Sequence, residues 1–210
     1  MGYVALAGVG SFILATVLLH WLQPELDPLN EAVSYYVHGA YGWLLTAGLL
    51  GLGIGSMVLT IGTGRAVDGP GTKTGLWLLA IWSVGVLVGG IFPADPPGNW
   101  DKPPSIPGLI HGNAALVAFL ALPIAGVVLA RSFRTDARWQ RSATLLLTLA
   151  IAMVLSLGAF AASIVPVLFS PGPPWLLGLT ERILIGVCVL WLGIVTLGLV
   201  RTDKNRRITT

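Results

Sequence analysis

Residues 175–200 read WLLGLTERILIGVCVLWLGIVTLGLV, and Glu181 and Arg182 are the only charged side chains in this stretch. A helix needs about 20 predominantly apolar residues to cross the hydrocarbon core of a bilayer, which is about 30 Å thick. The stretch is therefore long and apolar enough to form a transmembrane helix. Its adjacent acid and base are unusual, because charged side chains in hydrocarbon are costly and normally face the interior of a helix bundle.

The rest of the chain repeats this apolar pattern. Of its 210 residues, 55% are hydrophobic and 10% are charged, and the mean hydropathy is +0.83. Soluble domains carry about 25% charged residues, so this composition excludes an ordinary soluble domain. The single cysteine, Cys188, excludes an internal disulfide and a cysteine-based zinc site. We predict one all-α domain over 1–210, an integral membrane bundle of six transmembrane helices near residues 3–22, 40–62, 75–92, 109–130, 143–169 and 175–200.

Small residues recur at a spacing of four in three of these spans. This spacing lets membrane helices approach each other closely. We therefore predict helix packing at Gly51 with Gly55, at Gly85 with Gly89, and at Gly158 with Ala162.

The distribution of Lys and Arg among the loops predicts the orientation of the bundle. Segments 63–74, 131–142 and 201–210 hold ten Lys or Arg and three Asp, whereas the rest of the chain holds two basic and six acidic residues. Lys and Arg concentrate on the cytoplasmic side of membrane proteins. We therefore predict a multi-pass protein of the cell membrane with both termini in the cytoplasm. This topology also accounts for the basic pI of about 9.4, so nucleic acid is not an expected partner.

Polar residues gather on the predicted extracytoplasmic side. All three histidines and six of the nine acidic residues map there. Asp27 is a good N-cap, Pro28 suits the first position of a helix, and Gly39 favours a helix end. These signals predict a short amphipathic helix over residues 28–38, lying at the membrane surface.

The charged pair of the last span needs partners from other spans. A helix that begins at Pro174 would place Glu181 roughly 10 Å along its axis, at 1.5 Å per residue. Adjacent residues point in different directions on a helix, so Glu181 and Arg182 do not satisfy each other. We predict that Arg182 pairs with Asp27 or Asp95 in a polar cluster that opens outward. The members of this cluster are His20, Asp27, Asp95, His111, Glu181 and Arg182.

Six short elements follow one another along the chain. They are His20, Pro24-x-x-Asp27-Pro28, Ser34-x-Tyr36, Gly39-x-x-Gly42-Trp43, Phe92-Pro-x-Asp95 and Gly108-x-x-His111. With these elements and its six spans, the chain resembles, over nearly its whole length, the bacterial and archaeal membrane family catalogued as domain of unknown function 998. The family's pattern has an acid between the Ser and the Tyr, where this chain has Tyr35. The resemblance implies a six-span fold and carries no particular reaction.

Three kinds of catalysis fit the residue types of the predicted cluster. Two imidazoles and a carboxylate are the ligands of many catalytic zinc sites, although this chain has no closely spaced histidine pair. A Ser–His–Asp hydrolase would combine Ser34 with Asp95 and either His111 or His38, without a nucleophile-elbow sequence. General acid–base catalysis would need only Glu181 beside a histidine.

These considerations divide the polar residues into three sets. The candidate catalytic residues are His111, Glu181 and Asp95. The candidate ligand-binding residues are Arg182, His20, Asp27 and Ser34. The candidate metal ligands, should a metal be present, are His20, His111 and Asp95.

The favoured function is binding of a lipid or another amphipathic small molecule in an outward-opening polar pocket. The first alternative is an intramembrane hydrolase or acid–base enzyme that acts on a lipid or isoprenoid, with or without a metal. The second is a transporter, which is disfavoured because the inner half of each span lacks ionisable residues. The expected partners are membrane lipids and an amphipathic small molecule, and the sequence identifies neither a cofactor nor a protein partner.

Overall fold

The computed structural model describes residues 1–98, 100, 102–165, 169 and 172–208. These residues form six α-helices and one short 3-10 helix, and they contain no strand. The helices are α1 (Gly2–Leu22), η1 (Val33–His38), α2 (Gly42–Ala66), α3 (Thr72–Ile91), α4 (Ile106–Thr135), α5 (Gln140–Ile164) and α6 (Leu177–Ile208). Each α-helix contains a segment long and apolar enough to cross a membrane, which in α6 is Leu177–Thr202. The predicted all-α bundle of six transmembrane helices is confirmed.

The ends of the helices differ from the predicted spans by a few residues. The fourth helix begins at Ile106 because the Ser105 hydroxyl accepts a hydrogen bond from the Gly108 amide at 3.1 Å and so caps it. The predicted span 143–169 ends earlier, at Ile164, and its residues 166–168 lie outside the described part of the chain. The last helix begins at Leu177. Glu181 therefore lies roughly 6 Å from the start of α6, nearer the helix end than the roughly 10 Å predicted.

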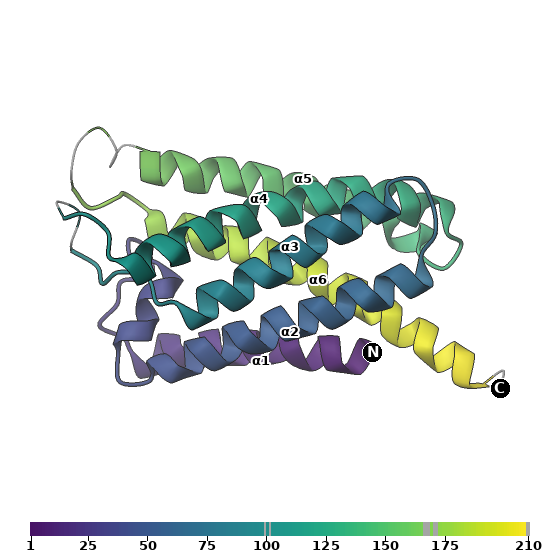
Figure 1. Cartoon of the computed structure of the whole chain (residues 1–210), viewed down its shortest axis with the longest axis horizontal. Coiled ribbons are helices and arrows are strands. Elements are labelled where there is room, and N and C mark those ends of the chain that lie inside the picture. The colour runs from purple at the N-terminus through teal and green to yellow at the C-terminus, as the bar shows by residue number, and fades with distance from the viewer. Residues whose placement is uncertain (99, 101, 166–168, 170–171, 209–210) are drawn as a thin grey trace.

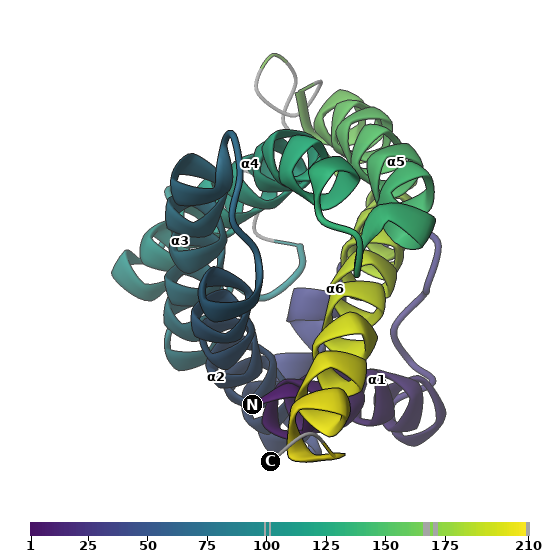
Figure 2. The same ribbon diagram turned by 90° about the vertical axis from the view of Figure 1, so that its right-hand side faces the viewer.

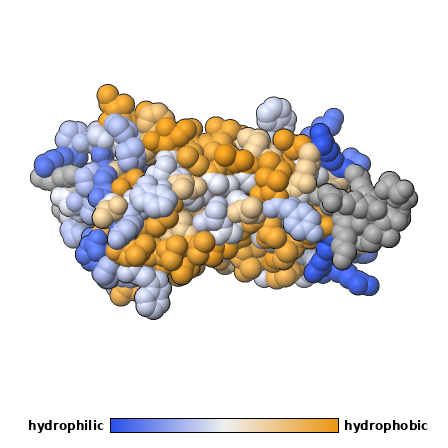
Figure 3. All heavy atoms as spheres, turned by 90° about the horizontal axis from the view of Figure 1, so that it is seen from below, coloured by the Kyte–Doolittle hydropathy of each residue, from blue (hydrophilic) through white to orange (hydrophobic). Residues whose placement is uncertain are grey.

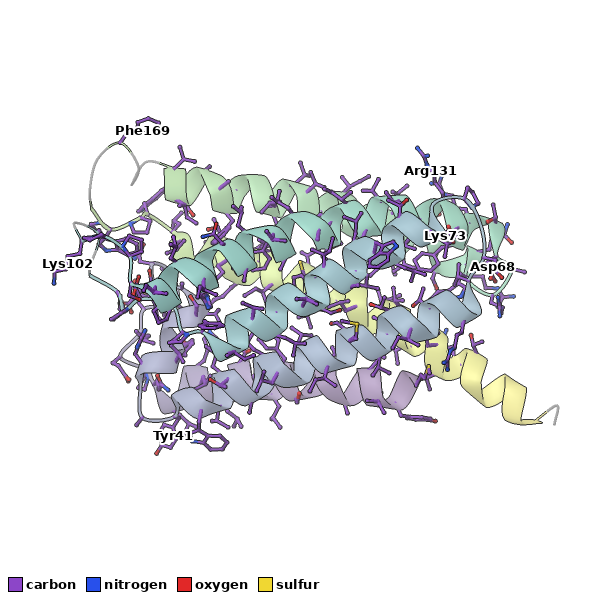
Figure 4. All side chains as sticks on the ribbon, in the orientation of Figure 1. Tyr41, Asp68, Lys73, Lys102, Arg131 and Phe169 are labelled. Carbon is purple, nitrogen blue, oxygen red and sulfur yellow. The ribbon has the colours of Figure 1, made fainter. Side chains whose placement is uncertain are left out.

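The six helices form a ring in chain order. Each packs on its neighbours in sequence, and α6 packs back on α1 and closes the ring. Figure 1 shows α6 running obliquely across the bundle. Both termini lie at one end, which also holds Asp68, Lys73 and Arg131 and is called the basic end (Figure 4). The other end holds η1 and the loop with Lys102 and is called the η1 end.

The surface of the bundle suits a membrane. Figure 3 shows hydrophobic residues over the middle of the face in view and hydrophilic residues at both ends. Large apolar side chains such as Leu14, Leu155 and Ile183 are exposed along the helices. Exposed apolar side chains of this kind face lipid in a membrane protein, so they carry no cost there.

Small residues bring the backbones of neighbouring helices together. A Cβ at Gly8 of α1 would collide with the Gly51 carbonyl oxygen and lie 2.8 Å from the Gly55 Cα of α2. A Cβ at Gly85 of α3 would lie 2.9 Å from the Ala114 carbonyl oxygen of α4. The packing predicted at Gly51, Gly55 and Gly85 is therefore confirmed.

The packing predicted at the fifth span is wrong at Gly158. A Cβ there would meet no atom within 4 Å among the described residues. Close helix contact at this end of α5 is therefore not the reason for the glycine.

The predicted helix over residues 28–38 begins five residues later, at Val33, and is a 3-10 helix. The Asp27 carboxylate accepts hydrogen bonds from the Leu29 amide and the Asn30 side chain, at 2.9 and 2.7 Å, and so holds a turn. The Leu29 carbonyl accepts a hydrogen bond from the Leu179 amide in the first turn of α6, at 3.0 Å. The Leu29 carbonyl, which a helix over residues 28–38 would use for its own hydrogen bonds, is thus bonded to α6. The element also packs into the bundle, since Val33 and Tyr36 are buried.

We expect Gly8→Ala to destabilise the protein by about 1–3 kcal/mol, because the added methyl group overpacks the contact between α1 and α2. Gly10→Ala is the matched control on the same helix, since its added methyl group meets nothing within 4 Å. Thermal unfolding in detergent micelles should show a lower Tm for Gly8→Ala only. Equal Tm values for the two variants would contradict the close packing of α1 on α2.

Candidate functional site

Arg182 joins three parts of the η1 end. Its Nε donates to His20 Nε2 of α1 at 2.9 Å. Its Nη1 donates to the Glu31 carbonyl at 2.7 Å and to the Gly178 carbonyl at 3.0 Å. Its Nη2 donates to the Tyr36 hydroxyl at 3.3 Å, and the guanidinium carbon lies 5.8 Å from the centre of the Tyr36 ring. The guanidinium is thereby bonded to α1, to the segment around η1 and to its own helix.

The contact with Arg182 fixes the protonation of His20. Because Arg182 has no hydrogen-bond acceptor, His20 Nε2 must carry a lone pair. The other nitrogen, Nδ1, lies 2.7 Å from the Thr16 carbonyl and therefore donates to it. Both nitrogens of a neutral imidazole are then occupied. His20 is thus held as a partner of Arg182, with no lone pair left for a metal.

The predicted pairing of Arg182 with Asp27 or Asp95 is wrong. Both carboxylates are already bonded to backbone amides, Asp27 to Leu29 and Asp95 to Ser105. The Leu29 amide, the Asn30 side chain and the more distant charge of Arg182 lower the pKa of the exposed Asp27. Asp27 thus influences Arg182 only through space, across the turn that it holds.

Glu181 directly precedes Arg182 in α6, but its side chain points in a different direction. Its side chain is 7% exposed, and its Oε2 accepts a hydrogen bond of 2.5 Å from the Val33 amide. Val33 is the first residue of η1, and Ala32 before it provides no side-chain cap. A carboxylate from α6 thus satisfies an amide at the start of η1 that would otherwise be buried without a partner.

Glu181 also lines a cavity inside the ring of helices, next to η1. The cavity has a volume of about 80 Å³, and its walls come from α1, η1, α2, α3, α4 and α6. Ser34 of η1 and His111 of α4 are its other polar or ionisable lining residues. The remaining wall is apolar and includes Phe12, Leu45, Leu52, Trp82, Phe119 and Val189. The structure therefore brings Glu181, His111 and Ser34 to one small, mainly apolar space.

His111 presents an unoccupied nitrogen in this region. Its Nδ1 lies 3.0 Å from the Gly89 carbonyl and 2.9 Å from the Phe92 carbonyl at the end of α3. Since both neighbours are acceptors, Nδ1 carries a proton and donates to them. The other nitrogen, Nε2, has no hydrogen-bond partner among the residues that the structure describes. His111 therefore retains one nitrogen for a ligand.

Asp95 belongs to a different part of the η1 end. Its Oδ2 accepts a hydrogen bond from the Ser105 amide at 3.0 Å, so it fastens the loop at the start of α4. It lines an outer pocket of about 370 Å³ with Tyr35, Trp100 and Lys102. Burial and the carboxylates of Glu181, Glu31 and Asp95 raise the pKa of the Tyr35 phenol, which stays neutral. The helix η1 separates this outer pocket from the cavity, because Tyr35 lines the one and Ser34 the other.

The predicted residues thus occupy four places. His20 and Arg182 bind each other, Asp27 holds an exposed turn, Asp95 lies in the outer pocket, and Glu181, His111 and Ser34 share the cavity. His38 donates from its Nε2 to the Ala94 carbonyl of the loop at 2.8 Å. Within the described chain, no three His, Cys, Asp or Glu side chains lie close enough together to hold a metal ion. His20, His111 and Asp95 therefore do not form a preformed set of metal ligands.

Sequence reasoning missed two contributors to this site. Tyr36 is fully buried and bonds Arg182 through its hydroxyl, and the Val33 amide binds Glu181. The Ser34-x-Tyr36 element contained a signal for the tyrosine. The sequence contains no signal for the Val33 amide, because every residue other than proline supplies a backbone N–H.

The comparisons with known proteins place the chain in one family. A model of the family described as Protein of unknown function (DUF998) matches residues 6–198. The chain belongs to this family. The match runs from α1 into α6 and so confirms the resemblance seen in the sequence. Neither the curated proteins nor the solved structures contain a match.

We expect Arg182→Lys to destabilise the protein by about 2 kcal/mol or more, because a lysine cannot replace the planar set of donors that binds His20, Glu31 and Tyr36. Arg201→Lys is the matched control, since Arg201 is exposed near the other end of α6. Unfolding in detergent micelles should separate the two variants. A Tm for Arg182→Lys equal to that of Arg201→Lys would show that the guanidinium does not hold the η1 end together.

Proposed function

We propose that this protein binds an amphipathic molecule of the membrane, such as a lipid or isoprenoid, with the polar group of that molecule in the cavity beside Glu181, His111 and Ser34. The observation that supports this most strongly is that an acid, Glu181, and a histidine, His111, both line one mainly apolar cavity. A polar group there could bond Glu181 and His111 while apolar walls surround the adjoining carbon atoms.

Capping the Val33 amide does not by itself require a carboxyl group at residue 181. A neutral side chain could accept a hydrogen bond from the Val33 amide without placing a carboxylate in a membrane-spanning helix. Charged side chains within membrane-spanning helices are costly, and they commonly mark functional sites. A carboxylate has about four lone-pair positions, so the bond to Val33 leaves acceptor capacity facing the cavity. These points favour a role for Glu181 in binding.

The free groups indicate the chemistry of the ligand. An ionised Glu181 and the Nε2 of His111 both accept hydrogen bonds, so they match a hydroxyl or amine group on the ligand. Arg182 matches a phosphate poorly, because its donors already bind His20, the Glu31 and Gly178 carbonyls and Tyr36. We therefore propose that the preferred ligands are alcohols or amines with a hydrocarbon chain.

An acid–base enzyme is the second candidate function. It is favoured by the same pair, since Glu181 and His111 can each exchange a proton with a bound hydroxyl or amine. The two functions differ in the fate of the ligand. Release of an unchanged molecule indicates a binding protein, and release of a chemically altered one indicates an enzyme.

We expect Glu181→Gln to weaken the binding of monoolein, a single-chain lipid with free hydroxyl groups, by about tenfold or more, and His111→Asn to weaken it by about threefold to tenfold. The loss of one hydrogen bond to a charged group is worth about 1.5–3 kcal/mol and of one between neutral groups about 0.5–1.5 kcal/mol, and 1.4 kcal/mol is tenfold in affinity. Glutamine still accepts from the Val33 amide, and asparagine still donates to the Gly89 and Phe92 carbonyls, so both variants should fold. Native mass spectrometry in detergent measures the binding.

Glu25→Gln is the control for these variants, because Glu25 is an exposed acid at the same end of the bundle. Its monoolein binding should equal that of the unmodified protein. Lysophosphatidate, with a phosphate head group on a single chain, should bind less tightly than monoolein. Equal monoolein binding by Glu181→Gln and Glu25→Gln, or tighter binding of lysophosphatidate, would refute the proposed site.

We also propose that the protein lies in the cell membrane with its basic end in the cytoplasm, on the strength of the Lys and Arg residues gathered there. Single cysteines at Lys102 and Arg134 test this, because both positions are exposed and lie at opposite ends, while Cys188 is buried. In intact cells a membrane-impermeant maleimide should label Lys102→Cys, and it should label Arg134→Cys only after permeabilisation. The reverse pattern would invert the topology.

A further inference from the structure

A long groove lies on the outer side of α3 and α4. It runs from Trp77 to Val88 on α3 and from Leu109 to Val117 on α4, and its volume is about 630 Å³. Asn113 is its single lining residue with a polar side chain, and the Asn113 amide donates to the Leu109 carbonyl of its own helix at 2.7 Å. Since α3 and α4 both contain membrane-spanning segments, hydrocarbon is the medium that this groove meets.

The dimensions of the groove suit one hydrocarbon chain. Eleven residues separate Trp77 from Val88, which corresponds to roughly 16 Å along the helix axis. Half of the hydrocarbon core of a bilayer is about 15 Å thick. The inner cavity, at about 80 Å³, has roughly an eighth of the volume of the groove, at about 630 Å³. The cavity therefore accommodates a polar end, and the chain attached to it must lie elsewhere.

The groove and the cavity share a wall. Gly85 lines both of them. Nearer to the η1 end, Gly89 and His111 line the cavity, while their chain neighbours Val88 and Ile110 line the groove. The two spaces thus lie on opposite sides of the seam between α3 and α4.

The seam is tight at Gly85 and looser at Gly89. A Cβ at Gly85 would lie 2.9 Å from the Ala114 carbonyl oxygen and 2.9 Å from the Ala118 Cβ, so the helix backbones are in close contact there. A Cβ at Gly89 would have its nearest neighbour, the His111 ring, at 3.8 Å, which is ordinary contact distance. At Gly89 a group passing between the helices meets the His111 side chain, which bonds the Gly89 and Phe92 carbonyls and is one of the two side chains proposed to bind it.

We propose that the ligand is a bilayer lipid that enters sideways between α3 and α4, with its hydrocarbon chain in the outer groove and its polar end turned through the seam at Gly89 toward His111 and Glu181. This inference rests on the proposed binding function and adds the route of entry and the place of the chain. The wall that the groove shares with the cavity, and the cavity's small size, select a lipid chain as the occupant of the groove.

Filling the groove tests the place of the chain. Val117→Trp inserts a large ring into the groove, and Val127→Trp makes the same change at an exposed position of α4 outside it. Monoolein binding, measured by native mass spectrometry in detergent, should fall about tenfold for Val117→Trp and stay unchanged for Val127→Trp. If Glu181→Gln weakens binding but Val117→Trp does not, the groove proposal fails and the binding site stands. If neither weakens binding, the proposed function fails as well.

Photo-crosslinking provides a readout that does not depend on the Trp variant folding. Benzoylphenylalanine replaces Val84, which lines the groove and is 50% exposed. The variant is then reconstituted in phosphatidylcholine nanodiscs supplemented with monoolein. Irradiation should attach monoolein in preference to the excess phosphatidylcholine, and Glu181→Gln should abolish that preference. Attachment in proportion to lipid abundance, or a crosslinked second copy of the protein, would overturn the proposal.

Discussion

The guanidinium of Arg182 lies in a membrane-spanning helix, and much of the η1 end is arranged to satisfy its N–H groups. Lipid offers no hydrogen-bond partners, so these donors must be bonded within the protein. His20, in the last turn of α1, turns its Nε2 toward Arg182, and the segment before η1 turns the Glu31 carbonyl toward it. Gly178 leaves room for that approach, since a Cβ there would collide with the Glu31 carbonyl oxygen. The irregular path of residues 28–32 follows from this requirement.

The same arrangement gives the adjacent Glu181 a different role. A step of one residue turns a helix by about 100°, so a helix that directs Arg182 to the α1 side directs Glu181 toward the interior of the ring. There one carboxylate oxygen holds the first amide of η1, and the side chain lines the cavity that contains His111. The hydrogen bonds of Arg182 and the proposed binding site are therefore adjacent but separate, and a ligand can engage Glu181 without releasing Arg182.

The fold could be predicted from the sequence because bilayer thickness fixes the length of an apolar span and because charges in such spans must face the interior. The association of Glu181 and Arg182 with residues of other segments followed from the same rule. The exact partners could not be predicted, because several of them are backbone groups, such as the Val33 amide and the Glu31 carbonyl. A pairing of Arg182 with Asp27 was expected from charge alone, but Asp27 forms shorter-range hydrogen bonds within its own turn.

The most direct test of this account is an experimental density map of the protein in lipid nanodiscs. The account predicts Arg182 within hydrogen-bond distance of His20 and Tyr36, Glu181 on the inner cavity, and an elongated lipid density along the groove between α3 and α4 that ends beside Gly89 and His111. A map in which Glu181 and Arg182 face the acyl chains from the outer surface of α6 would contradict it.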